Sequence, residues 1–305
     1  MKECIRIGTR DSSLALWQAN LVKSKLENLG YKTELKPVKS TGDLNLDQPL
    51  YEMGITGIFT KTLDVAMIKD EIDIAVHSMK DVPTALPKSI IQTAVLPRAN
   101  AQDILVHKGL DFDSKKGVIA TGSLRRKAQW LHQYPYHQIV NLRGNVNTRL
   151  EKLANNEWHG AIFAAAGLER IDLKPDEFVN LDWMIPAPAQ GAMLVVARED
   201  KDFAIEATQQ LNDKKTATCV QIERDFLRTL EGGCTAPIGA YAKFKNEHEI
   251  EFVGALFSLD GKKKLEEKAI IKSHEVSFAG KYLATEILKK GGEKLMRKIK
   301  QELNK

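Results

Sequence analysis

One local pattern occurs twice in this chain and constrains its fold more than any other feature. It consists of a strand, a turn rich in Ser, Thr and Gly, and then a helix. The first copy occupies residues 5–30 and the second occupies residues 118–133, each with apolar residues at helical spacing after the turn. Backbone amides at such a turn favour anions. The repetition predicts two similar α/β domains that face each other across a cleft.

The length of 305 residues exceeds that of one ordinary core, so several domains are expected. Leu96-Pro97-Arg98 and residues 186–192 are two candidate crossings between domains. From about residue 213, a helix, three alternating strands and a helical tail predict a small α+β domain. The expected boundaries are residues 1–97 with 194–212 for domain 1, 98–193 for domain 2, and 213–305 for domain 3.

The composition, 43% hydrophobic and 28% charged, is that of an ordinary globular protein. The net charge of +5 is mild, and no basic run is interleaved with aromatic residues, so nucleic acid is not an expected partner. No apolar run reaches membrane-spanning length, and no signal-peptide core is visible, which predicts a cytoplasmic protein. The three cysteines form no CxxC pair. Cys4 and Cys219 are expected in the core.

Cys234 lies in the segment Glu231-Gly232-Gly233-Cys234-Thr235-Ala236-Pro237-Ile238-Gly239. The two glycines predict a tight loop that presents an accessible thiol. Turn amides and nearby cations favour the thiolate, which is the reactive form. The alternative is a small buried hydrophobe beside a turn.

A buried strand at residues 72–76 leads into His77-Ser78-Met79-Lys80-Asp81-Val82-Pro83. Open α/β sheets bind ligands at the carboxyl ends of their strands, so Lys80 and Asp81 fall at a candidate site. The alternative is a solvated surface pair. Between Ser40 and Gly57, glycines, Pro49 and polar residues predict a mobile lid.

Five arginines stand at or near strand-to-helix turns of the second expected domain. The planar guanidinium binds carboxylates through two parallel hydrogen bonds and keeps its charge, so the cluster suits a ligand with several carboxylates or phosphates. The alternative is scattered surface salt bridges. No P-loop, GxGxxG or HExxH motif is present. The five residues are Arg125, Arg126, Arg143, Arg149 and Arg170.

Seven short motifs resemble those of the porphobilinogen deaminase family and occur in the family's order. Each motif is weak alone, but together they are specific and extend from residue 8 to about residue 239. They are Gly8-Thr9-Arg10, Ala15-Leu16-Trp17-Gln18, His77 to Pro83, Ser123-Leu124-Arg125-Arg126, Arg143-Gly144-Asn145, Ala187 to Gly191 and Gly232-Gly233-Cys234.

The resemblance implies two α/β domains like those of type-II periplasmic binding proteins, with a double chain crossover. It also implies a small C-terminal α+β domain with a three-stranded antiparallel sheet. In the family, a dipyrromethane cofactor is joined by a thioether to the residue that matches Cys234. Four porphobilinogen molecules are condensed onto it with loss of ammonia, and hydrolysis releases hydroxymethylbilane. No metal is implied, and we expect a monomer.

The resemblance also implies a role for individual residues. The carboxylate of Asp81 would be catalytic, because it can stabilise positive charge on pyrrole nitrogens and pass protons. The glycine-rich segment 54–57 lacks the basic residue that the family usually has there. The expected cofactor-binding residues are Cys234, Lys80, Asp81, Ser78, Thr121, Ser123, Arg125, Arg126 and Gly167. The expected substrate-binding residues are Arg10, Ser12, Gln18, Arg143, Arg149, Arg170 and Gln190.

Two other functions compete with this one. Facing α/β domains are also how small-molecule receptors are built, and a non-catalytic protein that binds a polycarboxylate would need neither a reactive cysteine nor a third domain. A cysteine-dependent acyl transferase is weakened because no His accompanies Cys234 in a recognisable pattern.

Overall fold

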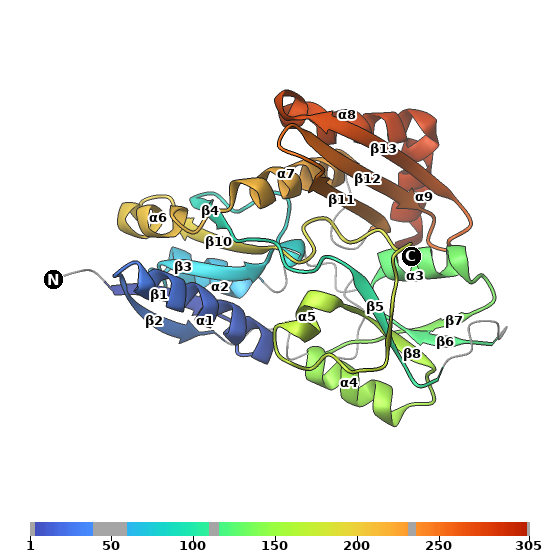
Figure 1. Ribbon diagram of the computed structural model, residues 1–305, viewed down its shortest axis with the longest axis horizontal. Helices are drawn as coiled ribbons and strands as arrows, with labels where there is room; N and C mark the ends of the chain where they lie inside the picture. Colours follow the sequence, from blue (N-terminus) through green and yellow to red (C-terminus); the bar gives the residue numbers. More distant parts are fainter. Residues whose placement is uncertain (1–3, 39–59, 110–115, 231–235, 304–305) are drawn as a thin grey trace.

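Three sheets, each covered by helices, make up the computed structural model (Figure 1). The structure describes residues 4–38, 60–109, 116–230 and 236–303. Cys234 and the whole of the predicted lid, residues 40–57, therefore lie outside the described residues. No helix among the described residues is long and apolar enough to cross a membrane.

The first sheet has five strands in the order β2-β1-β3-β10-β4. Strand β1 is parallel to β2 and β3, whereas β10 is antiparallel to both of its neighbours. Apolar side chains of α1 and α6 cover one face, and those of α2 cover the other. The bounds are β1 Cys4–Thr9, α1 Ser13–Asn28, β2 Lys32–Pro37, α2 Lys61–Ile68, β3 Ile74–Ser78, β4 Ile90–Val95, β10 Met193–Arg198 and α6 Asp202–Gln209.

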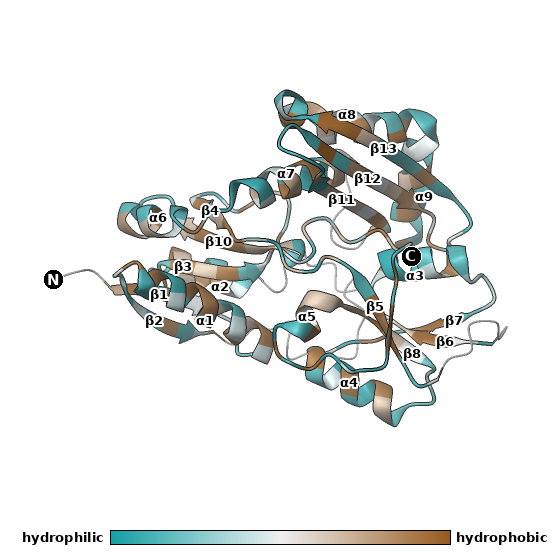
Figure 2. Ribbon diagram, viewed as in Figure 1, coloured by the Kyte–Doolittle hydropathy of each residue, from teal (hydrophilic) through white to brown (hydrophobic). Residues whose placement is uncertain are grey.

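The second sheet repeats this plan in the order β7-β6-β8-β5-β9, with β5 as the antiparallel strand. Trp130 of α3 is buried on one face, while Leu153 of α4 and Leu168 of α5 are buried on the other. The strands are apolar along most of their length (Figure 2). The bounds are β5 Asp103–His107, β6 Val118–Ala120, α3 Leu124–Gln133, β7 Gln138–Val140, α4 Val146–Asn155, β8 Gly160–Ala164, α5 Ala165–Glu169 and β9 Phe178–Asn180.

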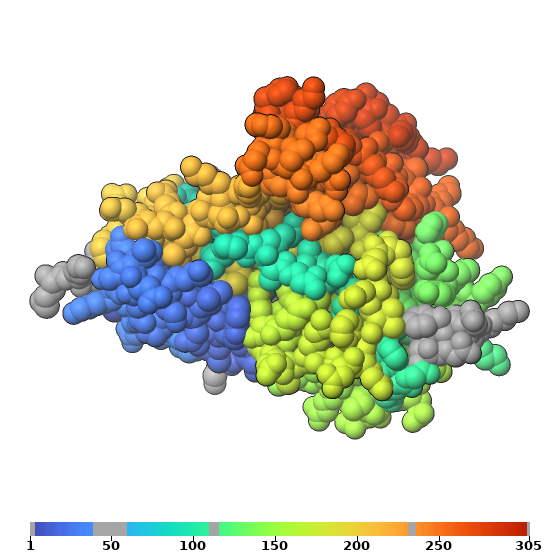
Figure 3. Space-filling view, viewed as in Figure 1, coloured from blue at the N-terminus to red at the C-terminus, as the bar shows by residue number. Residues whose placement is uncertain are grey.

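The third sheet is an antiparallel meander, β11-β12-β13, packed against the helices that flank it in sequence. Gly280 of α8 allows close approach to α7, because a Cβ there would lie 2.3 Å from the carbonyl oxygen of Ile222. This unit sits on top of the other two (Figure 3). The bounds are α7 Lys214–Thr229, β11 Ile238–Phe244, β12 Glu249–Phe257, β13 Lys264–Lys272, α8 Val276–Ile287 and α9 Glu293–Leu303.

These sheets confirm the expected fold class: two α/β units of the same design, and a C-terminal α+β unit with a three-stranded antiparallel sheet.

The chain passes from β4 to β5 and returns from β9 to β10, and the two connections run side by side. Ala99 N donates to Gly191 O at 3.2 Å, and Leu96 N donates to Met193 O at 3.1 Å. Gly191 has φ +85°, and a Cβ there would lie 2.6 Å from Ala99 O. Glycine is therefore required where the connections touch.

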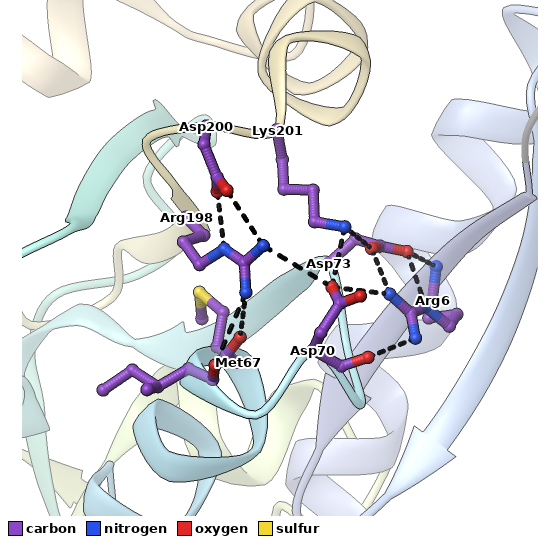
Figure 4. A network of polar contacts seen from close by, with 8 residues as sticks. Arg6, Met67, Asp70, Asp73, Arg198, Asp200 and Lys201 are labelled. Atoms are coloured by element: carbon purple, nitrogen blue, oxygen red, sulfur yellow. Dashed lines mark hydrogen bonds and ion pairs between the residues drawn. The ribbon is translucent and has the colours of Figure 1, made fainter.

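A polar network closes the amino-terminal end of the first sheet, away from these connections (Figure 4). The Arg6 guanidinium binds Asp73 with Nη2–Oδ1 at 2.6 Å and Nε–Oδ2 at 3.0 Å. Lys201 Nζ lies 2.7 Å from Asp70 Oδ1, and Arg198 reaches the carbonyl oxygen of Met67 near the end of α2. The network joins β1, the α2–β3 turn and the segment after β10.

Three local features of the structure were not anticipated from the sequence. Cys4 is exposed at the first residue of β1, where the strand has just begun, so the prediction that it lies in the core was wrong. Ser12 occupies the N-cap position of α1, but its side chain makes no capping hydrogen bond. The short strand β9 was missed because three residues are too few to show an alternating pattern.

Candidate active site

Lys80 and Asp81 end a short 3-10 helix, Met79–Asp81, which follows directly on β3. Asp81 is exposed, whereas Lys80 is partly buried. Burial lowers the pKa of Lys80 to about 8; the nearby Asp81 raises it, and Arg126 lowers it. The Lys80 ammonium donates to Gln190 Oε1 at 3.3 Å, so it reaches the returning connection between the sheets.

Arg125 and Arg126 extend from the first turn of α3 onto one buried carboxylate, that of Asp103. Arg125 Nη1 lies 2.6 Å from Asp103 Oδ2, and Arg126 Nη2 lies 2.7 Å from Oδ1. Burial alone would raise the pKa of Asp103, but the two guanidinium groups hold it well below its ordinary value. The carboxylate is therefore ionised, and it fixes both arginines in place.

Charged groups from both sheets converge at one place. Burial lowers the pKa of Arg149 to about 10, and the charges of Arg126, Asp81, Arg143 and Arg10 act on it as well. Arg10 and Asp81 follow strands of the first sheet, whereas the three other arginines belong to the second. Arg149 Nε donates to Gly144 O at 2.7 Å, which holds the side chain against its own turn. The described residues thus form a cationic site between the two sheets, to which Asp81 adds an exposed carboxylate.

The remaining arginines and the residues near them also lie between the two units. Arg170 Nη2 donates to Gly191 O at 2.7 Å, and its guanidinium lies 5.7 Å from the ring centre of Trp17 in α1. Gly167 faces Leu14 of the same helix, since a Cβ at Gly167 would lie 3.8 Å from Leu14 Cδ2. Arg143 is buried, and burial lowers its pKa.

Several expected site residues are held by hydrogen bonds inside their own unit. Gln18 is buried in α1, and its amide donates to Ser78 Oγ at 2.9 Å. Thr121 is buried and its hydroxyl accepts the Ser123 N–H at 3.2 Å. Ser123 caps α3 by accepting the Arg126 N–H. The described contacts of Ser12 do not connect it with this group.

Two acidic residues that organise the site were missed from the sequence. Asp103 and Glu223 are both 0% exposed. Glu223 accepts two hydrogen bonds from Arg98, at 2.6 and 3.1 Å, and also the backbone N–H groups of Ala189 and Ala242. The sequence feature that could have identified them is an acidic residue among apolar ones: Asp103 precedes Ile-Leu-Val, and Glu223 lies on the apolar face of its helix.

The fold and the charges define a two-lobed α/β protein whose cationic site suits a ligand with several carboxylates. The chain belongs to the porphobilinogen deaminase family. Residues 5–206 match the family model described as porphobilinogen deaminase, dipyrromethane cofactor binding domain, and residues 217–289 match that of the porphobilinogen deaminase C-terminal domain. These matches identify an enzyme, a transferase of tetrapyrrole biosynthesis that forms hydroxymethylbilane from porphobilinogen, and they decide against the receptor and the acyl transferase.

Curated relatives agree over nearly the whole chain. The porphobilinogen deaminase of Bacillus velezensis is 39% identical, over 98% of this chain and 98% of its own. That of Syntrophotalea carbinolica is 40% identical, over 96% of this chain and 95% of its own. A solved extracellular-binding protein of a probable amino-acid ABC transporter from Bacillus subtilis is 12% identical, covers 69% of this chain and 90% of its own, and has a TM-score of 0.42. That likeness is too distant to add to the argument.

Proposed function

We propose that this hydroxymethylbilane synthase holds its dipyrromethane through Cys234 and elongates it in the site between the first two sheets. The observation that carries the proposal is the convergence at Arg149, where charges from both lobes act on one group. Every pyrrole of the substrate and of the cofactor bears an acetate and a propionate. A growing chain therefore brings many carboxylates into the site, and several fixed guanidinium groups match that demand.

The residues around Asp103 fit the cofactor. Lys80, Arg125 and Arg126 share this one buried carboxylate, which leaves positive charge to be balanced. Arg125 Nε is buried and has no hydrogen-bond partner among the described residues. A buried donor of this kind is costly unless a ligand accepts from it. When bound, the dipyrromethane supplies the nucleophilic pyrrole carbon from which the product grows. We assign Lys80, Arg125 and Arg126 to its carboxylates, with Ser78, Thr121, Ser123 and Gly167 around it.

Asp81 is the group we assign to catalysis. It is exposed at the carboxyl end of β3, and its charge acts on Arg149 and Lys80. Loss of ammonia from porphobilinogen leaves an electron-poor pyrrole, and its capture places positive charge on ring nitrogens. A fixed carboxylate beside those nitrogens stabilises that charge and accepts the proton released when aromaticity returns.

Incoming substrate requires cations other than those that hold the cofactor. We assign its carboxylates to the arginines of the wider site, because these come from both lobes and the charges of Arg10, Arg143 and Asp81 all act on Arg149. Gln18 and Ser12, near the start of α1, complete the set as proposals from the sequence. The assigned residues are Arg10, Ser12, Gln18, Arg143, Arg149 and Arg170.

Cys234 is the best attachment point among the three cysteines. Cys219 is buried in the core of the third unit, and burial raises the pKa of its thiol to about 12. Cys4 lies at the start of β1, at the end of the strand opposite to Arg10. Cys234 itself lies outside the described residues, in the segment that follows α7. Only a thiol that ionises and reaches the site can form the thioether.

The domain boundaries, the monomeric state and the cytoplasmic location also remain predictions. The strand order supports the proposed division at 98–193, because β5 to β9 form a sheet of their own. The first sheet needs β10, which supports joining residues 194–212 to residues 1–97. The third sheet and its helices support a unit of residues 213–305.

Intact mass spectrometry tests the attachment. We expect the native protein to exceed its sequence mass by one dipyrromethane, and the Cys234→Ser variant to have the sequence mass and no activity. The Cys4→Ser variant, at an exposed position, should keep the adduct and serves as the control. A Cys234→Ser protein that still carries the adduct would refute the assignment.

A further inference from the structure

Asp103 is the centre of a fully buried hydrogen-bond network. Its Oδ2 accepts from Arg125 Nη1 at 2.6 Å. Its Oδ1 accepts from Arg126 Nε at 3.0 Å, Arg126 Nη2 at 2.7 Å and Gln190 Nε2 at 3.0 Å. A carboxylate that accepts this many charged donors is held in one orientation. It also holds those donors, so the two guanidinium planes are fixed relative to each other.

Gln190 extends this network to the other lobe. Its side chain is 0% exposed, and Nε2 also donates to Ala101 O at 2.7 Å. Because both hydrogens of Nε2 are used, Oε1 must point the other way, where it accepts from Lys80 Nζ at 3.3 Å. The amide therefore spans from Asp103, on β5, to Lys80, after β3. Arg98 Nε donates to the backbone carbonyl oxygen of Gln190 at 2.8 Å, which fixes the backbone at this residue.

The donors of this network are not used equally. Arg126 directs Nε and Nη2 to Asp103 and Nη1 to Ile162 O, so all three of its nitrogens are engaged. Within the described parts of the chain, Arg125 engages only Nη1, with Asp103 and Ile185 O as acceptors. Its buried Nε has no partner among the described residues. Arg125 therefore keeps the edge that binds carboxylates in bidentate fashion.

We propose that Asp103 and Gln190 are positioning residues that fix Arg125 and Lys80 in the geometry that receives the cofactor carboxylates, without contacting the cofactor themselves. The proposal rests on the proposed function. It gives Gln190 a different role from the substrate contact expected from the sequence, since both ends of its buried amide are already engaged. It also distinguishes Arg126, whose three nitrogens all have partners within the network, from Arg125, whose buried Nε is left for the ligand.

Positioning and simple charge attraction predict opposite effects of Asp103→Asn on the rate at which the protein captures the cofactor. Asp103→Asn removes the one carboxylate among the described residues whose charge acts on Lys80, Arg125 and Arg126 together, so attraction alone predicts faster capture of a polyanion. Positioning predicts slower capture, because the NH2 group of asparagine would face one of the two arginines in place of an acceptor, and the two guanidinium groups would repel each other. Gln190→Met changes no charge and removes only the side-chain amide that joins Lys80 to Asp103.

The experiment starts from cofactor-free protein, produced in cells unable to make porphobilinogen. Porphobilinogen is added, and intact mass follows the adduct that two molecules form with loss of two molecules of ammonia. We expect Gln190→Met to gain the adduct at least about tenfold more slowly than the wild type, since hydrogen bonds to charged groups are lost. Asp103→Asn should be slower still. Wild-type protein that gains no adduct would overturn the proposed function rather than this inference.

Thr208→Val is the matched control for the loss of a buried hydrogen bond. Thr208 is 0% exposed, and its hydroxyl donates to Ala204 O at 2.7 Å within α6. The Thr208→Val variant should be less stable than the wild type, but each folded molecule should gain the adduct at the wild-type rate. The adduct-bearing fraction of Gln190→Met should have a porphobilinogen KM within about twofold of the wild type, because its substrate arginines are unchanged.

Two outcomes would overturn the inference, namely adduct gain by Gln190→Met at the wild-type rate and acceleration of adduct gain in Asp103→Asn. If normal adduct gain by Gln190→Met is accompanied by a raised KM for porphobilinogen, Gln190 returns to substrate binding. Because Gln190→Met keeps every charge, it tests the inference even where Asp103→Asn fails to fold.

Discussion

The carboxylate of Glu223 forms a bidentate ion pair with the Arg98 guanidinium, with N–O distances of 2.6 and 3.1 Å. Arg98 lies on the first connection between the lobes, and Glu223 lies in α7 of the third unit. The same carboxylate accepts the N–H of Ala189 on the second connection at 2.6 Å. One acidic side chain therefore holds both connections against the helix that leads to the cysteine segment.

Removing this charge should destabilise the protein strongly. Glu223→Gln leaves the largely buried Arg98 without its counter-ion among the described residues, so we expect the free energy of unfolding to fall by about 3 kcal/mol or more. Urea denaturation at neutral pH measures the loss. Glu293→Gln, which breaks the exposed pair with Arg297, should change it by no more than about 0.5 kcal/mol. Equal effects of the two substitutions would contradict this account.

Asp81→Asn should separate chemistry from folding. We expect the rate of hydroxymethylbilane formation to fall by about a hundredfold or more, because a neutral amide neither stabilises the cationic pyrrole nor accepts its proton. The Asp81 side chain is exposed, so the melting transition and the adduct mass should be unchanged. Glu157→Gln, at another exposed position, should keep full activity. Near-normal turnover of Asp81→Asn would remove Asp81 from the mechanism.

Asp64 in α2 should make stability depend on pH. Burial raises its pKa from 3.8 to about 6, so the folded state binds this proton more tightly than the unfolded state does. Its contribution to stability is complete below the unfolded value and is lost as the pH rises through about 6. Asp64→Asn should therefore be more stable than the wild type at neutral pH, by on the order of 1 kcal/mol, with little difference near pH 4.

Denaturant titrations at several pH values between these limits check the Asp64 prediction. Exposed Glu71→Gln, three residues after α2, is the control and should show no such pH-dependent gain. A constant difference between Asp64→Asn and the wild type at all pH values would refute the assigned cause.

Gly191→Ala should be much more damaging than Gly109→Ala, although both glycines have positive φ. A Cβ at Gly191 would overlap Ala99 O, whereas no described residue comes within 4 Å of a Cβ at Gly109. We expect a loss of about 1 kcal/mol at Gly109 and at least about 2 kcal/mol at Gly191. Thermal or urea unfolding measures both. Similar losses would mean that the connections can separate at little cost.

Periodic sequence patterns predicted most of the fold. The two strand–turn–helix copies became β1–α1 and β6–α3, and the three alternating segments became the third sheet. These predictions succeed because each element buries one face against a core, so the spacing of apolar residues within that element alone reveals whether it is a helix or a strand. Strand β9 could not be predicted, since its three residues pair only with β5, far away in sequence.

The site was predictable by residue type and much less so by contact. Arg125 and Arg126 were recognisable at the start of a helix, and Lys80 and Asp81 at the end of a strand. Their shared partner Asp103 was not, because its role depends on a register that brings β5 beside β8 and α3. Likewise, Gln190 could be placed on a connection, but its reach to both Lys80 and Asp103 follows from the folded crossing.

The position of β10 between β3 and β4 sets an order for folding during synthesis. The second sheet has all of its strands once residue 180 has left the ribosome. The first sheet lacks an inner strand until residue 198 has emerged, although its other four strands are made by residue 95. The lobe that is synthesised later is therefore the first that can close its core, while the earlier one waits with an open gap between β3 and β4.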